Sequence, residues 1–332
     1  PLFPGEIEEF SMNFSTKFNG TDGRMHKGDD YYMVAHWYPR IEVYDHRLGW
    51  NHQYHLGREF YGDFGIFEWS LSLPANYIVE GTGWILNRDE MLPTELLEKI
   101  DIQNFEDKPW DEDASVIIPK TEEMKTWIFR AENVHDIAWM ASPNFRIGKS
   151  EWEGITVYSV AREQHASKWQ DAADVGIRFI RDYSERYGWY PYHKMIVSDV
   201  EDGMEYPMIT ADSGKSPEYI GLLGHEIGHN WFYGIIGSNE TYRAFLDEGF
   251  TNYITCVAMD SIWGPGSASM WEGWYKSNLY PRQSRKYTRN DIKYLKFART
   301  GYELSPLNTH SDYFKEYANY RQVYSKTASM LF

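Results

Sequence analysis

Cysteine is almost absent from this sequence: Cys256 is the one cysteine in 332 residues. A single cysteine excludes an internal disulfide, and its apolar neighbours predict a small buried side chain. The sequence also has no apolar run of membrane-spanning length, no internal repeat and no low-complexity tract, and its first residues lack a signal-peptide pattern. These absences predict no transmembrane segment in this chain, and a single cysteine leaves its compartment open.

Positive charge is scarce as well. The chain has 33 lysines and arginines against 49 aspartates and glutamates, which gives a formal net charge of −16. Binding to nucleic acid requires a basic face, so this composition argues against a nucleic-acid partner. A negative surface is compatible with the attraction of cationic groups, although we expect most of this charge to be ordinary solvated surface.

The residues that are present divide the chain into two parts. Apolar residues make up 42% of the chain and aromatic residues 17%, which is ample for packed cores. Residues 1–147 alternate apolar and polar side chains over short stretches between turn-rich pieces, which predicts a β-rich first domain. The expected strands in this domain are 10–14, 67–73, 77–79, 127–130 and 137–140. His52 and His55 have no third partner at a metal-binding spacing, and 106–113 is expected to be a solvated acidic loop rather than a calcium site.

From residue 148 the pattern changes to one of mixed strands and helices. We expect strands at 155–160 and 195–200 and a helix over 168–187. Pro217 and Glu218 suit the first turn of a further helix. A turn at 237–239, a helix over 246–259 and a last helix over 317–332 follow. The intervening stretch 263–310 is rich in loop signals and receives no firm assignment.

One stretch carries a pattern with a chemical meaning. His225, Glu226 and His229 form a His-Glu-x-x-His motif. Histidines at i and i+4 lie one turn apart on the same face of a helix, so both imidazoles can reach one metal ion. Zinc accepts neutral histidine nitrogen and carboxylate oxygen, and a catalytic zinc keeps one position for water. Glu226 follows the first ligand and points beside the metal, where a general base for the bound water belongs.

The competing interpretation is a surface helix with two ordinary histidines. Gly224 and Gly228 flank the histidines, and glycine is costly inside a helix unless close packing or function requires it. The aromatic run 231–233 makes another face of the helix apolar, which predicts that the helix is buried and that its polar groups need a partner. Glu248 then offers a third ligand from a second helix. Together these features favour the metal site.

The motifs carry a family resemblance. Eighteen residues separate His229 from Glu248, and the segments HEIGHNWF and FLDEGFTNY surround these ligands. With DGMEYP upstream and VYSKTASML at the far end, the chain resembles the gluzincin family of alanyl aminopeptidases (aminopeptidase N) and leukotriene hydrolase. The segments HWYPRIEVYD and SLPANYIVEG resemble the family's N-terminal domain more loosely. The resemblance implies an α+β fold, with a saddle-like β domain followed by a thermolysin-like zinc domain.

The resemblance also implies roles for residues of the catalytic half. One zinc ion would be bound by His225, His229 and Glu248, and Glu226 would be the general base. The implied activity is that of a zinc aminopeptidase, which hydrolyses the N-terminal peptide bond of peptides with a free N-terminus.

Three further residues and a tyrosine would contact the substrate. Glu205 would bind the free α-amine, Gly203 and Met204 would line the peptide as an edge strand does, and Tyr324 would donate a hydrogen bond to the oxyanion. Each has an ordinary alternative. Glu205 could be a strand-end carboxylate, and Tyr324 has tyrosines at 313, 317 and 320 as neighbours.

Departures from the family pattern keep other functions open. Tyr206 replaces an asparagine of the exopeptidase motif, Asp202 replaces its first glycine, Thr327 replaces a common glycine, and an insertion precedes Tyr324. The alternatives are a zinc endopeptidase, an epoxide hydrolase-like member, or a protein-binding relative without catalysis. The chain starts inside an apparent β domain and stops inside a predicted helix, so we expect fragment ends. The sequence around the motifs most resembles bacterial members of the family that carry export signals, which favours a periplasmic or cell-surface location.

Overall fold

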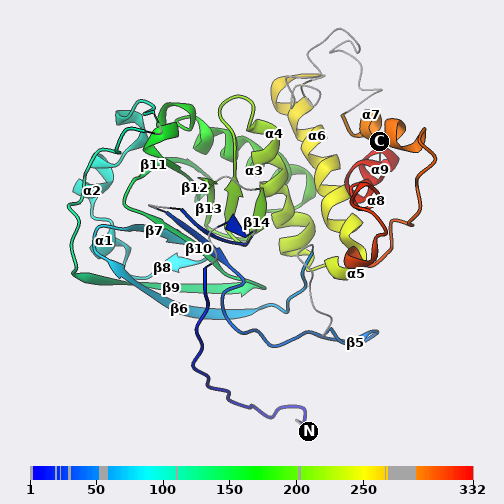
Figure 1. Cartoon of the computed structure of the whole chain (residues 1–332), viewed down its shortest axis with the longest axis horizontal. Helices are drawn as coiled ribbons and strands as arrows, with labels where there is room; N and C mark the ends of the chain where they lie inside the picture. The colour runs from blue at the N-terminus through cyan, green and yellow to red at the C-terminus, as the bar shows by residue number, and fades with distance from the viewer. Residues whose placement is uncertain are drawn as a thin grey trace.

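The structure is a computed structural model that describes residues 3–18, 21–22, 24–28, 31–51, 59–109, 111–200, 203–265, 267 and 289–331. The predictions for His52, His55 and Asp202 lie outside these residues. Strands dominate the N-terminal part, and helices gather around the C-terminal part (Figure 1). Among the described residues, no helix is both long and apolar enough to cross a membrane.

Antiparallel sheets make up the N-terminal part. A five-stranded sheet has the order β1 (Thr21–Asp22), β2 (Met25–Lys27), β3 (Tyr32–Ala35), β10 (Ala138–Ser142) and β7 (Ile78–Gly81). A three-stranded sheet has the order β6 (Gly65–Pro74), β9 (Met124–Val134) and β8 (Trp84–Ile85). A two-stranded sheet pairs β4 (Tyr44–Asp45) with β5 (Gly49–Trp50). Partly buried and exposed residues alternate along β6, as predicted, and Trp69 stacks on Phe129 with ring centroids 3.9 Å apart.

The strand predicted at 10–14 is wrong. This segment pairs with no described strand, and Phe10 and Met12 are 70% and 60% exposed. Alternation indicates which side chains share a face, but a strand also needs a partner for its backbone hydrogen bonds. Two short helices were missed in this part of the chain, α1 (Arg88–Met91) and α2 (Thr94–Lys99).

The C-terminal part is built on a mixed sheet. Its order is β11 (Phe145–Trp152), β12 (Ile155–Arg162), β13 (Lys194–Asp199), β15 (Ile209–Asp212) and β14 (Met204–Tyr206). The strands β12, β13 and β15 are parallel, and α3 (Ala172–Tyr187) forms the crossover between β12 and β13. The edge strand β14 is antiparallel to β15. The domain boundary expected after residue 147 falls inside β11, which belongs wholly to this sheet.

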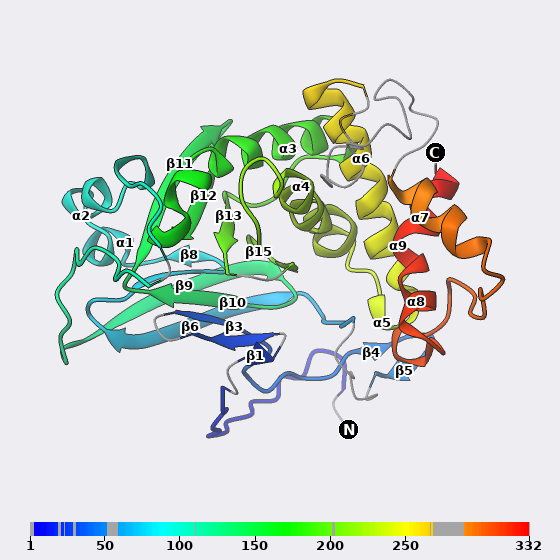
Figure 2. The same ribbon diagram turned by 45° about the horizontal axis from the view of Figure 1, so that its top comes forward.

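The helices that carry the motif residues pack on this sheet. α4 (Ile220–His229) continues as the π-helical turn η3 (Asn230–Ile235). α5 (Glu240–Ala244) and η4 (Phe245–Gly249) then lead into α6 (Phe250–Trp263). α7 (Arg289–Ala298) lies in the stretch that received no assignment, and the predicted last helix is divided into α8 (Tyr317–Tyr320) and α9 (Gln322–Leu331). Figure 2 shows α9 between α6 and α7.

Close packing explains the two glycines of α4. A Cβ on Gly224 would collide with the ring of Phe179, and one on Gly228 would lie 3.1 Å from Thr251 and 3.2 Å from Ile254. These contacts hold α4 against α3 and α6, so the histidines are carried by a helix that is fixed on both sides.

A large hydrophobic core lies on each face of the mixed sheet. Ile196 and Ile209 pack in one core with the N-terminal residues Met33 and Phe129. Val197, the neighbour of Ile196 on β13, packs in the other core with residues of α3, α4 and α6. Successive residues of a strand point to opposite faces, so the N-terminal part covers one face of the sheet and the helices cover the other. Cys256 is buried in the second core, as expected.

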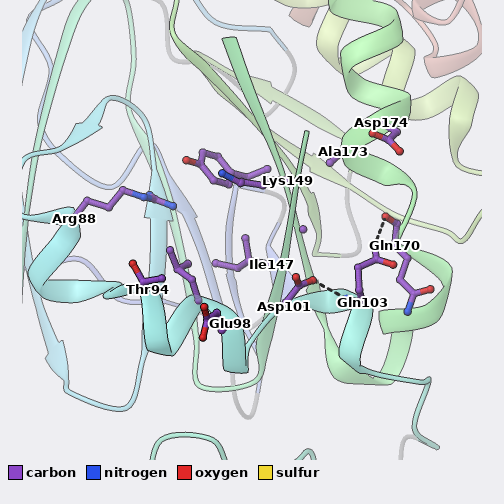
Figure 3. Close-up of a pocket in the computed structure, with 13 residues that line it drawn as sticks. Arg88, Thr94, Glu98, Asp101, Gln103, Ile147, Lys149, Gln170, Ala173 and Asp174 are labelled. Atoms are coloured by element: carbon purple, nitrogen blue, oxygen red, sulfur yellow. Dashed lines mark hydrogen bonds between the residues drawn. The ribbon is translucent and has the colours of Figure 1, made fainter. Parts of the chain in front are cut away.

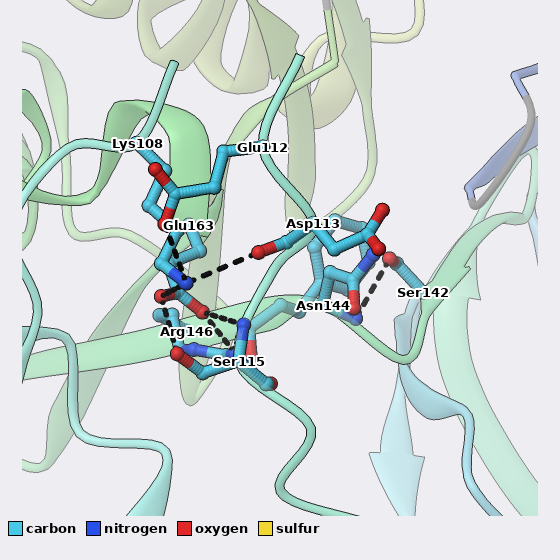
Figure 4. A network of polar contacts seen from close by, with 9 residues as sticks. Lys108, Glu112, Asp113, Ser115, Ser142, Asn144, Arg146 and Glu163 are labelled. Atoms are coloured by element: carbon cyan, nitrogen blue, oxygen red, sulfur yellow. Dashed lines mark hydrogen bonds and ion pairs between the residues drawn. The ribbon is translucent and has the colours of Figure 1, made fainter. Parts of the chain in front are cut away.

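The acidic loop expected at 106–113 is docked rather than freely solvated. The ammonium of Lys108 lies 3.5 Å from the carboxylate of Glu163, which also forms an ion pair with Arg146 (Figure 4). Asp107 accepts a hydrogen bond from the backbone of Ser167 at 2.9 Å. Among the described residues, no group with metal-binding geometry includes a residue of this loop.

Candidate active site

Three predicted metal ligands, two from α4 and one from η4, meet in the structure. The Nε2 atoms of His225 and His229 lie 3.1 Å apart. The Oε2 atom of Glu248 lies 3.0 Å from the first of these nitrogens and 3.4 Å from the second. All three side chains are buried. Two imidazole nitrogens and one carboxylate oxygen, converging in this way, fit the ligand set of a catalytic zinc site.

The electrostatics of this group favour a bound cation. Burial lowers the pKa of His225 to about 4, so its imidazole is neutral, as a metal ligand must be. Burial acts against ionisation of Glu248, but hydrogen bonds from both histidines outweigh it and lower the pKa of this carboxyl. Burial also acts to lower the pKa of His229, yet Asp247 and Glu205 raise it well above its usual range. The site therefore demands positive charge at the point where the three ligands converge.

Asp247 orients one of the histidines. It hydrogen-bonds to Nδ1 of His229, which leaves Nε2 facing the other two ligands. A carboxylate on the far nitrogen of a metal-binding histidine sets its tautomer and raises its basicity. The sequence analysis noted Asp247 beside Glu248 but gave it no role, because nothing in the spacing shows which residue lies behind an imidazole.

The carboxylate of Glu226 lies beside the ligands without binding in their place. Its Oε2 atom is buried and has no hydrogen-bond partner among the described residues. A Cβ on Gly203 would lie 3.2 Å from Oε1 of Glu226, so the backbone that leads into β14 passes directly over this carboxylate. Burial, together with the charge on Glu205, raises the pKa of Glu226 well above its usual range. A carboxylate in this setting is suited to accept a proton.

The edge strand β14 brings Glu205 to the same place. An oxygen of Glu205 and ligand atoms of His229 and Asp247 all lie within 4.8 Å of one another. Met204 precedes it and pairs with Ala211 of β15, while the other edge of β14 has no partner in the described part of the sheet. The departure at Tyr206 does not alter this face. Its ring is buried against Phe60, on the opposite side of the strand from Glu205.

Tyr324 reaches the ligands from α9. Its ring stacks near that of His225 with centroids 6.1 Å apart, and its hydroxyl hydrogen-bonds to Glu248. Burial and the charge of Glu248 raise the pKa of Tyr324 well above its usual range, so the phenol stays a hydrogen-bond donor. The alternatives Tyr313 and Tyr317 are 61% and 63% exposed.

Gly249 sets the distance between Tyr324 and the ligands. A Cβ on this residue would lie 2.6 Å from the carbonyl oxygen of Val323 and would collide with the side chain of Thr327. The absence of a side chain lets α9 approach η4 closely. Thr327, which stands where the family commonly has glycine, fills the space over Gly249.

Two acidic residues of the site were missed by the sequence analysis. Glu59 precedes β6, and Glu240 opens α5, yet both are buried in the same cluster of carboxylates as Glu205 and Asp247. Neither residue belongs to a motif, and Glu59 comes from the N-terminal part of the chain. Only the tertiary structure could place them here.

A pocket elsewhere in the molecule has none of these features. It has a volume of about 440 Å³ and lies between α2, β11 and the start of α3 (Figure 3). Its charged side chains include Arg88 and Lys149, but Arg88 is already ion-paired with Glu80 at 2.8 Å, and Lys149 with Glu151 at 3.1 Å. The buried ionisable groups described above gather instead around His225, His229 and Glu248.

The mixed fold and the candidate ligands, two histidines and one glutamate, are compatible with a zinc metallopeptidase. Residues 204–332 match the model of the Peptidase family M1 domain. The match begins at β14 and ends after α9, and therefore includes every ligand and Tyr324.

Two known proteins are similar to parts of this chain or to its fold. Leucine aminopeptidase 2 of Emericella nidulans is 30% identical over 106 residues, which are 29% of this chain and 17% of that protein. An M1 zinc metallopeptidase of Deinococcus radiodurans, solved as a mutant bound to a Tyr-Ser-Ala substrate, has a similar fold. Its TM-score is 0.53 at 12% identity, over 94% of this chain and 60% of that one. The chain thus spans less than two thirds of the length of either protein.

Proposed function

We propose that this chain is the catalytic part of a zinc aminopeptidase, which hydrolyses the N-terminal peptide bond of a peptide. One observation carries the proposal. The buried carboxylate of Glu205, on an edge strand, lies within 4.8 Å of a zinc ligand, His229. A carboxylate so close to the metal positions a free α-ammonium one residue from the scissile bond.

The edge strand would bind the substrate. A peptide added to the outer edge of β14 pairs with the backbone of this strand, as peptides do on other exposed sheet edges. Glu205 accepts hydrogen bonds from the α-ammonium. Because Tyr206 is buried on the other face of the strand, the amine anchor remains intact, which supports an exopeptidase over an endopeptidase.

The remaining residues would perform the proton chemistry. When bound by His225, His229 and Glu248, zinc supplies a Lewis acid that polarises the carbonyl and lowers the pKa of water. Glu226 takes a proton from the attacking water and delivers it to the departing amine. Tyr324 donates a hydrogen bond to the oxygen on which negative charge develops, and its raised pKa keeps that proton in place.

Matched peptides test this proposal directly. One peptide is prepared with its N-terminus free and with it acetylated, and each is incubated with the zinc-loaded full-length protein. Mass spectrometry of the products should show residues lost one at a time from the free peptide alone. Internal cleavage of both peptides would overturn the exopeptidase assignment and leave the zinc site standing. No cleavage of either by a protein with stoichiometric zinc would favour a binding protein.

A further inference from the structure

Four buried carboxylates form a second cluster next to the zinc ligands. Glu59, Glu205, Glu240 and Asp247, hereafter the four-carboxylate cluster, each place one oxygen within 4.8 Å of the others. They come from the segment before β6, from β14, from α5 and from η4. Exposure is at most 5% for any of them. A zinc ion on His225, His229 and Glu248 uses none of these oxygens as ligands.

The cluster contains polar atoms that lack any partner. Glu240 is 0% exposed, and neither of its carboxylate oxygens has a hydrogen-bond partner among the described residues. The same holds for Oδ2 of Asp247, whose other oxygen orients His229. The buried hydroxyl of Tyr233 is also without a partner there, and the charges of Glu240 and Glu205 help to raise its pKa. Buried polar atoms are nearly always satisfied, so these point to a ligand.

Among the residues that the structure describes, Arg24 and Arg40 act on the cluster and on its neighbour Tyr233. Arg24 acts on Glu59 and Glu205, lowering the pKa of each, although burial outweighs it and both values are raised. Arg40 is already ion-paired with Asp136 at 2.7 Å. Burying several carboxylates together is strongly unfavourable unless they are paired or bind a cation.

The dimensions of the cluster restrict the cation. The four oxygens all lie within 4.8 Å of one another, so one compact ion can contact all of them. A lone ammonium offers three donors and a single charge to four carboxylates. A compact ion with higher charge is the better match.

We propose that the four-carboxylate cluster is a second cation site, for a hard divalent ion of the calcium class. Calcium takes six to eight oxygens at about 2.3–2.6 Å, so opposite ligands lie about 4.6–5.2 Å apart, and the four oxygens fit within that span. Carboxylates that bind through one or both oxygens provide enough ligands. Zinc prefers nitrogen and sulfur, which the cluster lacks. Through Asp247 the ion stabilises the orientation of His229.

Terbium luminescence tests the site without any peptide. The zinc-loaded protein is titrated with Tb³⁺, whose emission is sensitised by nearby tyrosines, and the bound ion is then displaced by Ca²⁺. We expect one saturable site per chain, in addition to zinc. Glu240→Gln should weaken binding at least tenfold, with zinc content unchanged. Glu122→Gln, at an exposed position, is the matched control and should bind as the wild type does.

Thermal unfolding separates loss of the site from loss of the fold. Calcium should raise the Tm of the wild type and of Glu122→Gln, with little effect on Glu240→Gln. Without calcium, Glu240→Gln should be at least as stable as the wild type, because burial opposes ionisation of the Glu240 carboxyl and raises its pKa well above its usual range. No saturable Tb³⁺ site, or equal binding by Glu240→Gln, would overturn the proposal. Because no turnover is measured, either result leaves the aminopeptidase proposal to its own test.

Discussion

At the scale of single residues, neighbours decide what each carboxylate of the site can do. Glu248 and Glu226 are both buried, and they lie close to the same histidines. Hydrogen bonds from the histidines hold Glu248 ionised, whereas Glu226 has an oxygen without a partner and a raised pKa. In the proposed mechanism the first is therefore a zinc ligand and the second a proton acceptor, although the side chains are identical.

The general-base role predicts a selective loss in Glu226→Gln. An amide cannot accept the proton, so we expect kcat to fall about 10²–10⁴-fold. Zinc content should remain one ion per chain, since Glu226 is not a ligand. Metal analysis and steady-state kinetics measure the two effects. Wild-type turnover by a zinc-loaded variant would refute the role.

The oxyanion role predicts a different loss in Tyr324→Phe. Removing one donor of this kind costs about 10²–10³ in kcat, and KM should change little because the bond forms only as charge develops. Tyr313→Phe, at an exposed tyrosine in the same region, serves as the control. If the two variants have the same kcat, Tyr324 does not act on the oxyanion.

His135 makes stability depend on pH. It is 1% exposed, and neither ring nitrogen has a partner among the described residues; burial lowers its pKa to about 3. In the unfolded chain the imidazole of His135 binds a proton below about pH 6.5. In the folded chain it stays neutral until the pH approaches 3. The stability that His135 contributes is therefore complete above pH 6.5 and declines as pH falls towards 3, by about 1.4 kcal/mol per pH unit.

The variant His135→Phe should remove this dependence, since phenylalanine does not titrate. The free energy of unfolding of the variant, relative to the wild type, should therefore improve as pH falls from 6.5 to 4. Urea unfolding at several pH values measures this difference. The exposed His46→Gln is the control. A difference that stays constant across the range would show that His135 is protonated in the folded protein.

At the scale of elements, the site depends on how closely helices can approach one another. The glycines of α4 admit Phe179 and Thr251, and Gly249 admits α9. The spacing of the histidines follows from the helix alone. The distance from Tyr324 to the ligands follows from contacts between η4 and α9, two elements separated by α6 and α7 in the chain.

Gly249→Ala should therefore be harmful, although alanine is normally favoured over glycine in a helix. The new methyl group meets the carbonyl oxygen of Val323 at 2.6 Å, and overpacking of this kind costs about 1–3 kcal/mol. We expect a lower Tm and a kcat that falls because Tyr324 is displaced. At Gly65, an added Cβ meets only Phe67 at 3.8 Å, so Gly65→Ala is the control. Higher stability of Gly249→Ala would contradict the close approach.

At the scale of the whole molecule, the two parts are joined by a shared core and a shared site. The N-terminal sheets cover one face of the mixed sheet, and Glu59 enters the site from the N-terminal part. A division after residue 147 would cut β11 and expose Ile196 and Ile209.

Residues 148–332 expressed alone should consequently fail to fold cooperatively. Exposing one face of the sheet removes part of the apolar burial that stabilises it, at about 25 cal/mol per Å². Circular dichroism during heating should show no sharp transition for this fragment and a sharp one for residues 1–332. A fragment with a sharp transition and bound zinc would show that the second part is an independent domain.

Much of this protein could be predicted from local patterns. The helix with its two histidines and most strands follow from periodicities within a few residues, and the structure contains them. Glu248 was expected from its spacing to His229 and from the family resemblance, and the structure places it beside both histidines. The strand at 10–14 was mispredicted because a strand needs a pairing partner, and local alternation does not show whether another segment supplies one. The helix α7 was missed because loop signals obscured its short apolar pattern.

The sequence by itself determined the ligand set, because the rise and turn of a helix place His225 and His229 together wherever that helix lies. Only the tertiary structure decided which carboxylates surround them. Asp247 lies behind His229, and Glu59 and Glu240 join Glu205, because segments far apart in the chain pack into one buried volume. Local spacing is encoded in neighbouring residues, whereas this convergence is a property of the packed core.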